Sequence, residues 1–406
     1  MTQVIFDIMS AYAAIYRKIP TPIIYDPNTR RLKAIRNFRQ LIPSLISCTL
    51  IMGLFSVGPK FLQLCYLLFL KRQLGHFPTP KEDPFAAPMQ LVSIALVLIC
   101  SGGGVVTSGF MYICHANVVP DINAIIGMAE FLENEIITKN KPTEKSRQFV
   151  STVRYAPHVV LYMTPALSIY ALFKGLDPLS FIIHWIPKKV LGLEVWLLAK
   201  LFSLVNLSLA CVTSGQVLLG MGYVLVFAIW LLLHNVKLVD AMSRGRSSVA
   251  LYNQVQIILT SVTPAQATFS IFGMLVCAIA IIMCNIITLT MYNVLPPNLY
   301  LLAPFWSFVL LLILNIVLKY GSQFERVSKE MLRRWRRDAR LAIMRGMGRE
   351  HARRIAALRP LRPWIGVWRM NVLPVDRTLL CDYDTFIAES TMAWLMAFDQ
   401  HNQRIS

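Results

Sequence analysis

The side chains of this chain that are most suited to chemistry are the acids of its last apolar stretch. Asp382, Asp384 and Glu389 interrupt residues 378–398, which otherwise resemble a membrane span. Asp382 and Glu389 are seven residues apart and share one helix face. Carboxylates at membrane depth are costly and do not face lipid. We predict that this face lines a cation pathway, where several copies of the helix form rings of carboxylates. The face also carries Thr385, Met392 and Met396.

Two other interpretations of this stretch remain open. If the helix begins later, Asp382 and Asp384 lie in the headgroup region, and only Glu389 enters the membrane, hydrogen-bonded to another span. Alternatively, the segment does not span the bilayer at all.

Known catalytic patterns are absent from the sequence. It has no phosphate-binding glycine motif, no C-x-x-C and no H-E-x-x-H, and its seven histidines include no i,i+4 pair. Its eight cysteines are too sparse for a disulfide scaffold. We therefore expect no enzyme, no metal site and no cofactor.

The elements that position the acidic face are membrane helices. The chain has 406 residues, of which 56% are hydrophobic and only 15% charged, a composition typical of an integral membrane protein. Seven segments approach the roughly 20 apolar residues that a spanning helix needs. They are residues 41–59, 89–113, 153–173, 210–233, 267–292, 300–318 and 378–398. We predict an all-α, multi-pass protein of the plasma membrane with seven transmembrane helices.

Two further apolar stretches are ambiguous. Residues 61–70 are too short for a span and favour an interfacial or re-entrant piece. Residues 190–205 are interrupted by Glu194 and Lys200, which suggests an amphipathic approach to the fourth span. Either stretch could instead be part of a helix that extends beyond the bilayer. We predict no signal peptide in the basic first 40 residues.

The distribution of Lys and Arg predicts the orientation. Of the 40 basic residues, 31 fall on the N-terminal side of the seven-span arrangement. Basic residues stay cytoplasmic, so the N-terminus should be inside and the C-terminus outside, the reverse of a G-protein-coupled receptor. The net charge of +19 then reflects orientation and anionic lipid, not nucleic acid.

The segment 319–358 is the most distinctive polar part. Its apolar residues recur at helical spacing and its arginines occupy the opposite face. It either continues from the sixth span and packs on other cytosolic helices, or lies on anionic lipid. The apolar set is Phe324, Val327, Met331, Trp335 and Ala339, and the basic set is Arg333, Arg334, Arg337 and Arg340. We divide the chain into a six-helix region with an N-terminal arm (1–318), a basic cytosolic segment (319–377) and a last helix with a short outer tail (378–406).

The stretch Arg359-Pro360-Leu361-Arg362-Pro363-Trp364-Ile365-Gly366, followed by an apolar link and Thr378, resembles the segment before the last helix of arthropod odorant and gustatory receptors. The layout of seven spans, an inner N-terminus and a late cytosolic segment is also similar to theirs. Gustatory members often carry T-Y-(five apolar)-Q-F in the last helix, whereas here Thr391 precedes Met392 and the Gln is missing. The odorant or gustatory branch therefore stays open.

The resemblance implies a chemosensory, ligand-gated, non-selective cation channel of four subunits, homomeric or with a co-receptor. The last helix would line the pore, and 324–358 would join the subunits. A small organic odorant or tastant would bind in the outer half of the bundle, although ordinary helix packing also explains the residues that topology puts there. They are Ser93, Tyr170, Phe173, Ser208, Tyr300 and Trp306. A secondary transporter or a G-protein-coupled receptor is the alternative.

Overall fold

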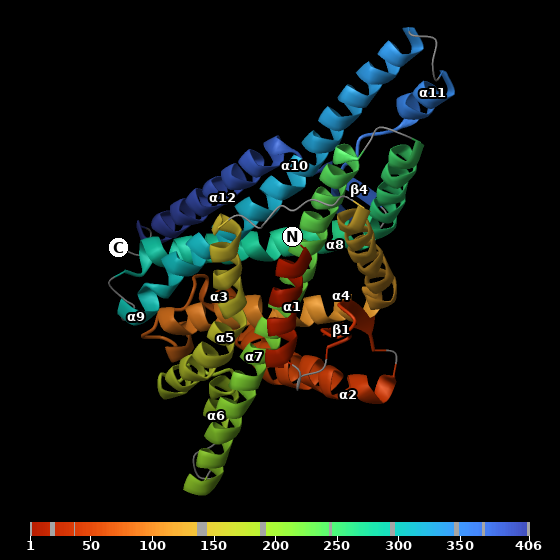
Figure 1. Ribbon diagram of the computed structural model, residues 1–406. Helices are drawn as coiled ribbons and strands as arrows, with labels where there is room; N and C mark the ends of the chain where they lie inside the picture. Colours follow the sequence, from red (N-terminus) through yellow and green to blue (C-terminus); the bar gives the residue numbers. More distant parts are fainter. Residues whose placement is uncertain are drawn as a thin grey trace.

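The computed structural model describes residues 2–16, 21–35, 37–135, 144–186, 192–242, 246–292, 297–344, 349–367 and 370–403. These residues form long helices with two short β-hairpins (Figure 1). The long helices are the continuous series α2 (Phe38–Ile46), η1 (Ser47–Val57) and α3 (Gly58–Leu74), then α4 (Pro88–Glu135), α5 (Glu144–Phe173), α7 (Leu193–Ala241), α8 (Arg246–Thr290), α10 (Leu302–Met344) and α12 (Arg377–Gln403).

The protein is an all-α membrane protein. Within the described residues, five helices are long and apolar enough to cross a bilayer: Phe38–Leu74, Pro88–Glu135, Leu193–Ala241, Ser248–Thr290 and Ala303–Met344. Their outer surfaces carry large apolar side chains such as Phe61, Leu198 and Phe308, each more than half exposed. Ser56 and Asn206, by contrast, are buried. Apolar side chains outside and polar ones inside suit a bundle surrounded by lipid.

The first long helix includes one of the ambiguous stretches. Residues 61–70 belong to α3, which continues without a break from η1, a π-helical stretch, so of the interpretations left open they form part of a longer helix. Lys60, which suggested a boundary, is fully buried. The helix ends at Leu74, where Gly75 adopts a left-handed φ of 77°, a common helix end. Residues 193–205 likewise form the first turns of α7, as expected for an approach to the fourth span.

The N-terminal arm packs against the end of the bundle where α4 ends. It comprises α1 (Thr2–Tyr16) and a hairpin of β1 (Ile23–Asp26) and β2 (Arg31–Ala34), in which Ile23 pairs with Ala34. Arg31 donates to Glu130 of α4 at 2.5 Å, and Asn123 bonds both backbone groups of Leu32. The arm is therefore an integral part of this end.

The largest hydrophobic core lies at the same end and includes the apolar face of α10. Phe324, Met331, Trp335 and Ala339 are all less than 8% exposed and pack with residues of α7, α8 and α11 (Arg349–Ala357). A helix lying on lipid would not bury this face within its own chain. The structure thus supports the interpretation that residues 319–358 pack on other helices, and α10 and α11 form a hairpin that projects beyond its neighbours (Figure 1).

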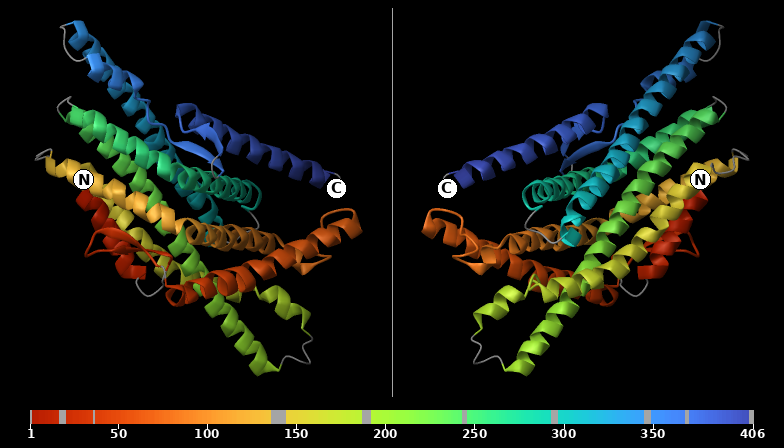
Figure 2. Two further views of the ribbon diagram at one scale, coloured as in Figure 1. Left: turned by 90° about the vertical axis from the view of Figure 1, so that its right-hand side faces the viewer. Right: turned by 90° about the vertical axis from the view of Figure 1, so that its left-hand side faces the viewer.

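The last helix lies on the outside of the bundle (Figure 2). A hairpin of β3 (Trp364–Val367) and β4 (Met370–Pro374) precedes it, and it packs on α8 and α10. Three short helices complete the described connections: η2 (Pro84–Ala86), α6 (Ser180–Trp185) and α9 (Pro297–Tyr300).

Candidate functional site

One face of α12 is fixed against the bundle. Leu379, Tyr383, Ile387 and Thr391, each four residues apart, are all less than 9% exposed. The Tyr383 hydroxyl donates to the Met274 carbonyl of α8 at 2.7 Å. Tyr383 and Ile387 pack with apolar residues of α8 and α10. This contact sets the rotation of α12 about its own axis.

The acidic face of α12 consequently points away from its own chain. Asp382 and Glu389 are exposed, as are the other predicted pore-lining residues Thr385, Met392 and Met396. Among the described residues, neither carboxylate has a hydrogen-bond or ion-pair partner. A single chain therefore leaves these acids unsatisfied, and in a membrane they need water, cations or another copy of the protein.

The start of α12 is capped by Asp376. Its Oδ1 accepts hydrogen bonds from the backbone N–H groups of Thr378 and Leu379, both at 3.1 Å, and from the Thr378 hydroxyl at 2.8 Å. The Thr378 hydroxyl is the main cause that holds the pKa of this carboxyl below its ordinary value, and the backbone N–H groups add to it. Such a cap stabilises the first helical turn.

The segment that leads to α12 is bound tightly to α8 and α10. We call residues 358–363 the strap. The Tyr252 hydroxyl donates to the Arg359 carbonyl at 2.8 Å. The Ser328 hydroxyl accepts from the Leu361 N–H at 2.9 Å. Arg336 donates to the Leu358 carbonyl at 2.7 Å. The strap thus links α12 to the large core at the end of α10.

A buried ion pair is the strongest of these contacts. Glu325 of α10 is 5% exposed, and its Oε1 lies 2.6 Å from Arg362 Nη2 and 2.6 Å from Lys329 Nζ. Arg362 also lies over the Trp364 ring, 5.7 Å from its centroid. The resemblance singled out this stretch of sequence, and the structure gives it a positioning role.

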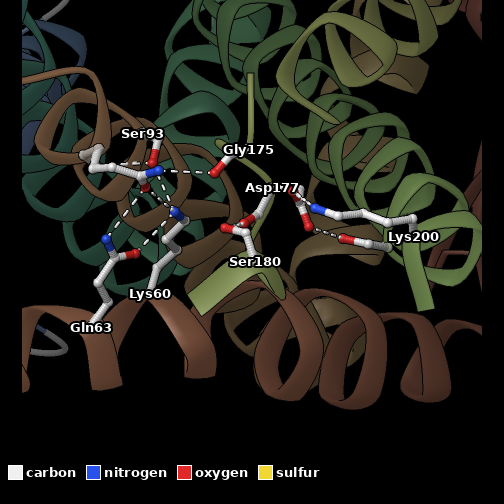
Figure 3. Close-up of polar contacts among 9 residues, drawn as sticks. Lys60, Gln63, Ser93, Gly175, Asp177, Ser180 and Lys200 are labelled. Atoms are coloured by element: carbon white, nitrogen blue, oxygen red, sulfur yellow. Dashed lines mark hydrogen bonds and ion pairs between the residues drawn. The ribbon is translucent and has the colours of Figure 1, made fainter. Parts of the chain in front are cut away.

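A second group of polar residues is buried where α3, α4 and α7 meet (Figure 3). Lys60 Nζ donates to Ser93 Oγ at 2.8 Å, to Gln63 Oε1 at 3.0 Å and to Gln90 Oε1 at 3.4 Å. Lys60 and Gln63 have no exposed surface. All three ammonium protons therefore have neutral acceptors, which is what a buried ammonium requires.

Asp177 forms the other half of this group. It is fully buried and accepts from Lys200 Nζ at 3.1 Å and from Ser203 Oγ at 2.6 Å. Gln90 joins the halves, because its side-chain nitrogen donates to the Gly175 carbonyl at 2.9 Å (Figure 3). Two lysines against one aspartate leave the group with one net positive charge.

The predicted ligand-binding residues are only partly brought together. Ser93 belongs to the buried polar group, and Tyr300 packs beside the same end of α4, near Val92. Phe173 is 83% exposed and Trp306 is 44% exposed, so both face away from the bundle. Ser208 on α7 and Tyr170 on α5 are partly buried.

The sequence interpretation missed Lys60, Gln63, Gln90 and Asp177. The available signal was that Lys60 stands between two apolar stretches, residues 41–57 and 61–70, although Gly58 and Pro59 precede it. It was interpreted as a boundary, whereas ionisable residues within apolar helices are functional candidates.

No family model matches this sequence, and no curated protein matches it.

Proposed function

We propose that the chain is one subunit of a ligand-gated, non-selective cation channel of the plasma membrane with a chemosensory role. The observation that carries the proposal is the orientation of α12: its apolar face is buried and its acidic face is left to the outside of the protomer. In this proposal α5 and α12 join the five apolar helices as spans, with the N-terminus inside.

A symmetric assembly explains the exposed acids. Four copies of α12 around one axis would turn Asp382 and Glu389 into two rings of carboxylates facing water. Such rings attract cations and repel anions. Thr385, Met392 and Met396 would line the same path. An isolated chain offers no comparable environment, because two carboxylates would face lipid.

The buried polar group is the candidate for the ligand response. It lies between α3, α4 and the segment that leads into α7, in the half of the bundle that the proposed orientation makes the outer half. Lys60, Ser93 and Gln90 form its polar part, and the aromatic rings of Tyr66, Phe85 and Phe181 pack against one another in an apolar cluster of the same helices and the short helices η2 and α6. Apolar walls with a few polar groups suit a small organic odorant or tastant.

The test is ion selectivity in planar bilayers that contain the purified chain. In asymmetric salt, Glu389→Gln should shift the reversal potential towards zero, the value for a pore that does not distinguish cations from anions. Asp384→Asn is the matched control: two residues turn a helix by roughly 200°, so Asp384 lies on the far side of α12 from Asp382. Asp384→Asn should leave the reversal potential unchanged.

Three results would contradict the proposal. Equal shifts from both variants would mean that surface charge, not a pore lining, sets the potential. Uptake of a solute without channel current would favour a secondary transporter, and an N-terminal tag accessible on intact cells would favour a G-protein-coupled receptor.

A further inference from the structure

The projecting end of α10 carries a groove of about 470 Å³ lined by four arginines. The lining residues are Arg333, Arg336, Arg337, Arg340, Leu341 and Met344. Its volume is within the range of small-molecule sites. Leu341 and Met344 are 48% and 83% exposed and give the groove an apolar edge beside its charged floor.

Most charges of this groove are unpaired within the part of the chain that the structure describes. Among the described residues, Arg333 and Arg340 have no hydrogen-bond or ion-pair partner, and Arg337 reaches only Asp338, at 3.9 Å. Two arginines of α10 outside this set are paired: Arg334 lies 2.7 Å from Asp240, and Arg326 lies 3.8 Å from Glu330. Two guanidinium groups of the groove, those of Arg333 and Arg340, are therefore available to an anion.

Unpaired positive charges on one helix face destabilise the helix unless an anion neutralises them. Arg333 and Arg337 are four residues apart, Arg337 and Arg340 three, so their charges repel across one face. Arg336 adds its charge at the same point, although one of its nitrogens is held by the Leu358 carbonyl. Guanidinium groups bind phosphate oxygens in a bidentate manner, and several phosphates on one molecule would engage several arginines at once.

The place of the groove indicates where the phosphates come from. Arg340 follows Leu318, the predicted end of the sixth span, by 22 residues, which is roughly 33 Å of helix. A lipid headgroup at the membrane surface does not reach that far along an upright helix. We propose that this groove binds a soluble small molecule with clustered phosphate groups. The inference does not depend on channel function.

The experiment measures binding of inositol hexakisphosphate and of inorganic tripolyphosphate to the full-length chain in zwitterionic detergent by calorimetry. The variant Arg333→Gln/Arg337→Gln/Arg340→Gln removes the unpaired charges. The control Arg349→Gln/Arg353→Gln/Arg354→Gln removes as many charges from exposed positions of α11. Elution on gel filtration confirms that each variant is folded.

We expect the groove variant to raise the dissociation constant at least ~10-fold and the α11 control to change it less than ~2-fold, with binding weaker at high salt. No binding by the wild type, or equal loss in both variants, would overturn the proposal. Vesicles of phosphatidylcholine with phosphatidylinositol bisphosphate form the second arm. Groove-dependent binding to these vesicles alone would overturn the soluble source and assign the groove to a lipid headgroup.

Discussion

Removing the charge of Glu325 should loosen the strap from α10. This carboxylate is almost fully buried and receives Arg362 from the strap, at 2.6 Å from Nη2 and 2.8 Å from Nε. Lys329 of its own helix is the second partner, at 2.6 Å. The substitution Glu325→Gln keeps the shape of the side chain and removes its charge. It leaves Arg362 beside a neutral amide in a largely dry site.

The size of the effect follows from three terms. The Coulomb attraction at this distance is at most about 6 kcal/mol with an effective dielectric constant of 20. Desolvation of both groups offsets most of it, and a hydrogen bond to a charged group contributes about 1.5–3 kcal/mol net. The Arg362 side chain is 36% exposed, which screens the pair further. We expect a coupling of about 1.5 kcal/mol, or roughly 2 °C in melting temperature for a chain of this length.

The assay is a double-mutant cycle on melting temperature in detergent, with Glu325→Gln, Arg362→Gln and the double variant. The double variant should lose clearly less than the sum of the single variants. Glu330→Gln is the control, because this exposed carboxylate lies 3.8 Å from Arg326, and it should change the melting temperature by less than ~0.5 °C. Additive losses would refute the reasoning, because Arg362 would then be held by other contacts.

Two further predictions concern the attachment of α12. Asp376→Ala removes the cap and should cost about 1 kcal/mol at neutral pH, measured as melting temperature. Because the folded-state pKa of Asp376 is lower than its ordinary value of 3.8, this contribution is present above pH 3.8 and is lost as the pH falls through the folded-state pKa. If the variant still melted below wild type at a pH where this carboxyl is protonated, the result would argue against the cap. Gly321→Ala should destabilise the protein by about 1–2 kcal/mol, since the added Cβ would lie 2.7 Å from Val375 Cγ1. The control Gly102→Ala meets nothing within 4 Å and should be neutral or stabilising; equal losses in melting temperature would count against the predicted clash.

Periodicity predicted the helices that have one apolar face. The recurrence of Phe324, Met331 and Trp335 at helical spacing predicted that α10 continues beyond its apolar part, and these residues are buried together. On α12, the seven-residue spacing of Asp382 and Glu389 predicted one acidic face, and both are exposed while Leu379 and Ile387 are buried. In both helices the sequence predicts the buried face because the buried residues recur every three or four positions along the same helix.

Contacts between segments distant in sequence could not be predicted in this way. The acceptors of Lys60 include Ser93, 33 residues away, and Tyr252 binds the strap across 107 residues. A lysine next to an apolar run looks the same in the sequence in both cases: when it marks the end of a helix, and when polar side chains from elsewhere in the chain enclose it. The β3–β4 hairpin was missed for a related reason, because strands of four and five residues are too short to show alternation.

The charged residues around Lys60 and those on α12 differ in whether the chain itself supplies their partners. Lys60 is enclosed, and Ser93, Gln63 and Gln90 accept its protons within the same chain, so it needs no partner to be stable. Asp382 and Glu389 have no such acceptor or donor among the described residues. Partners from outside the chain are therefore needed at α12, and not at the polar group near α3. This difference supports the proposal that the acidic face of α12 meets water inside an assembly, whereas the polar group around Lys60 is complete within one chain.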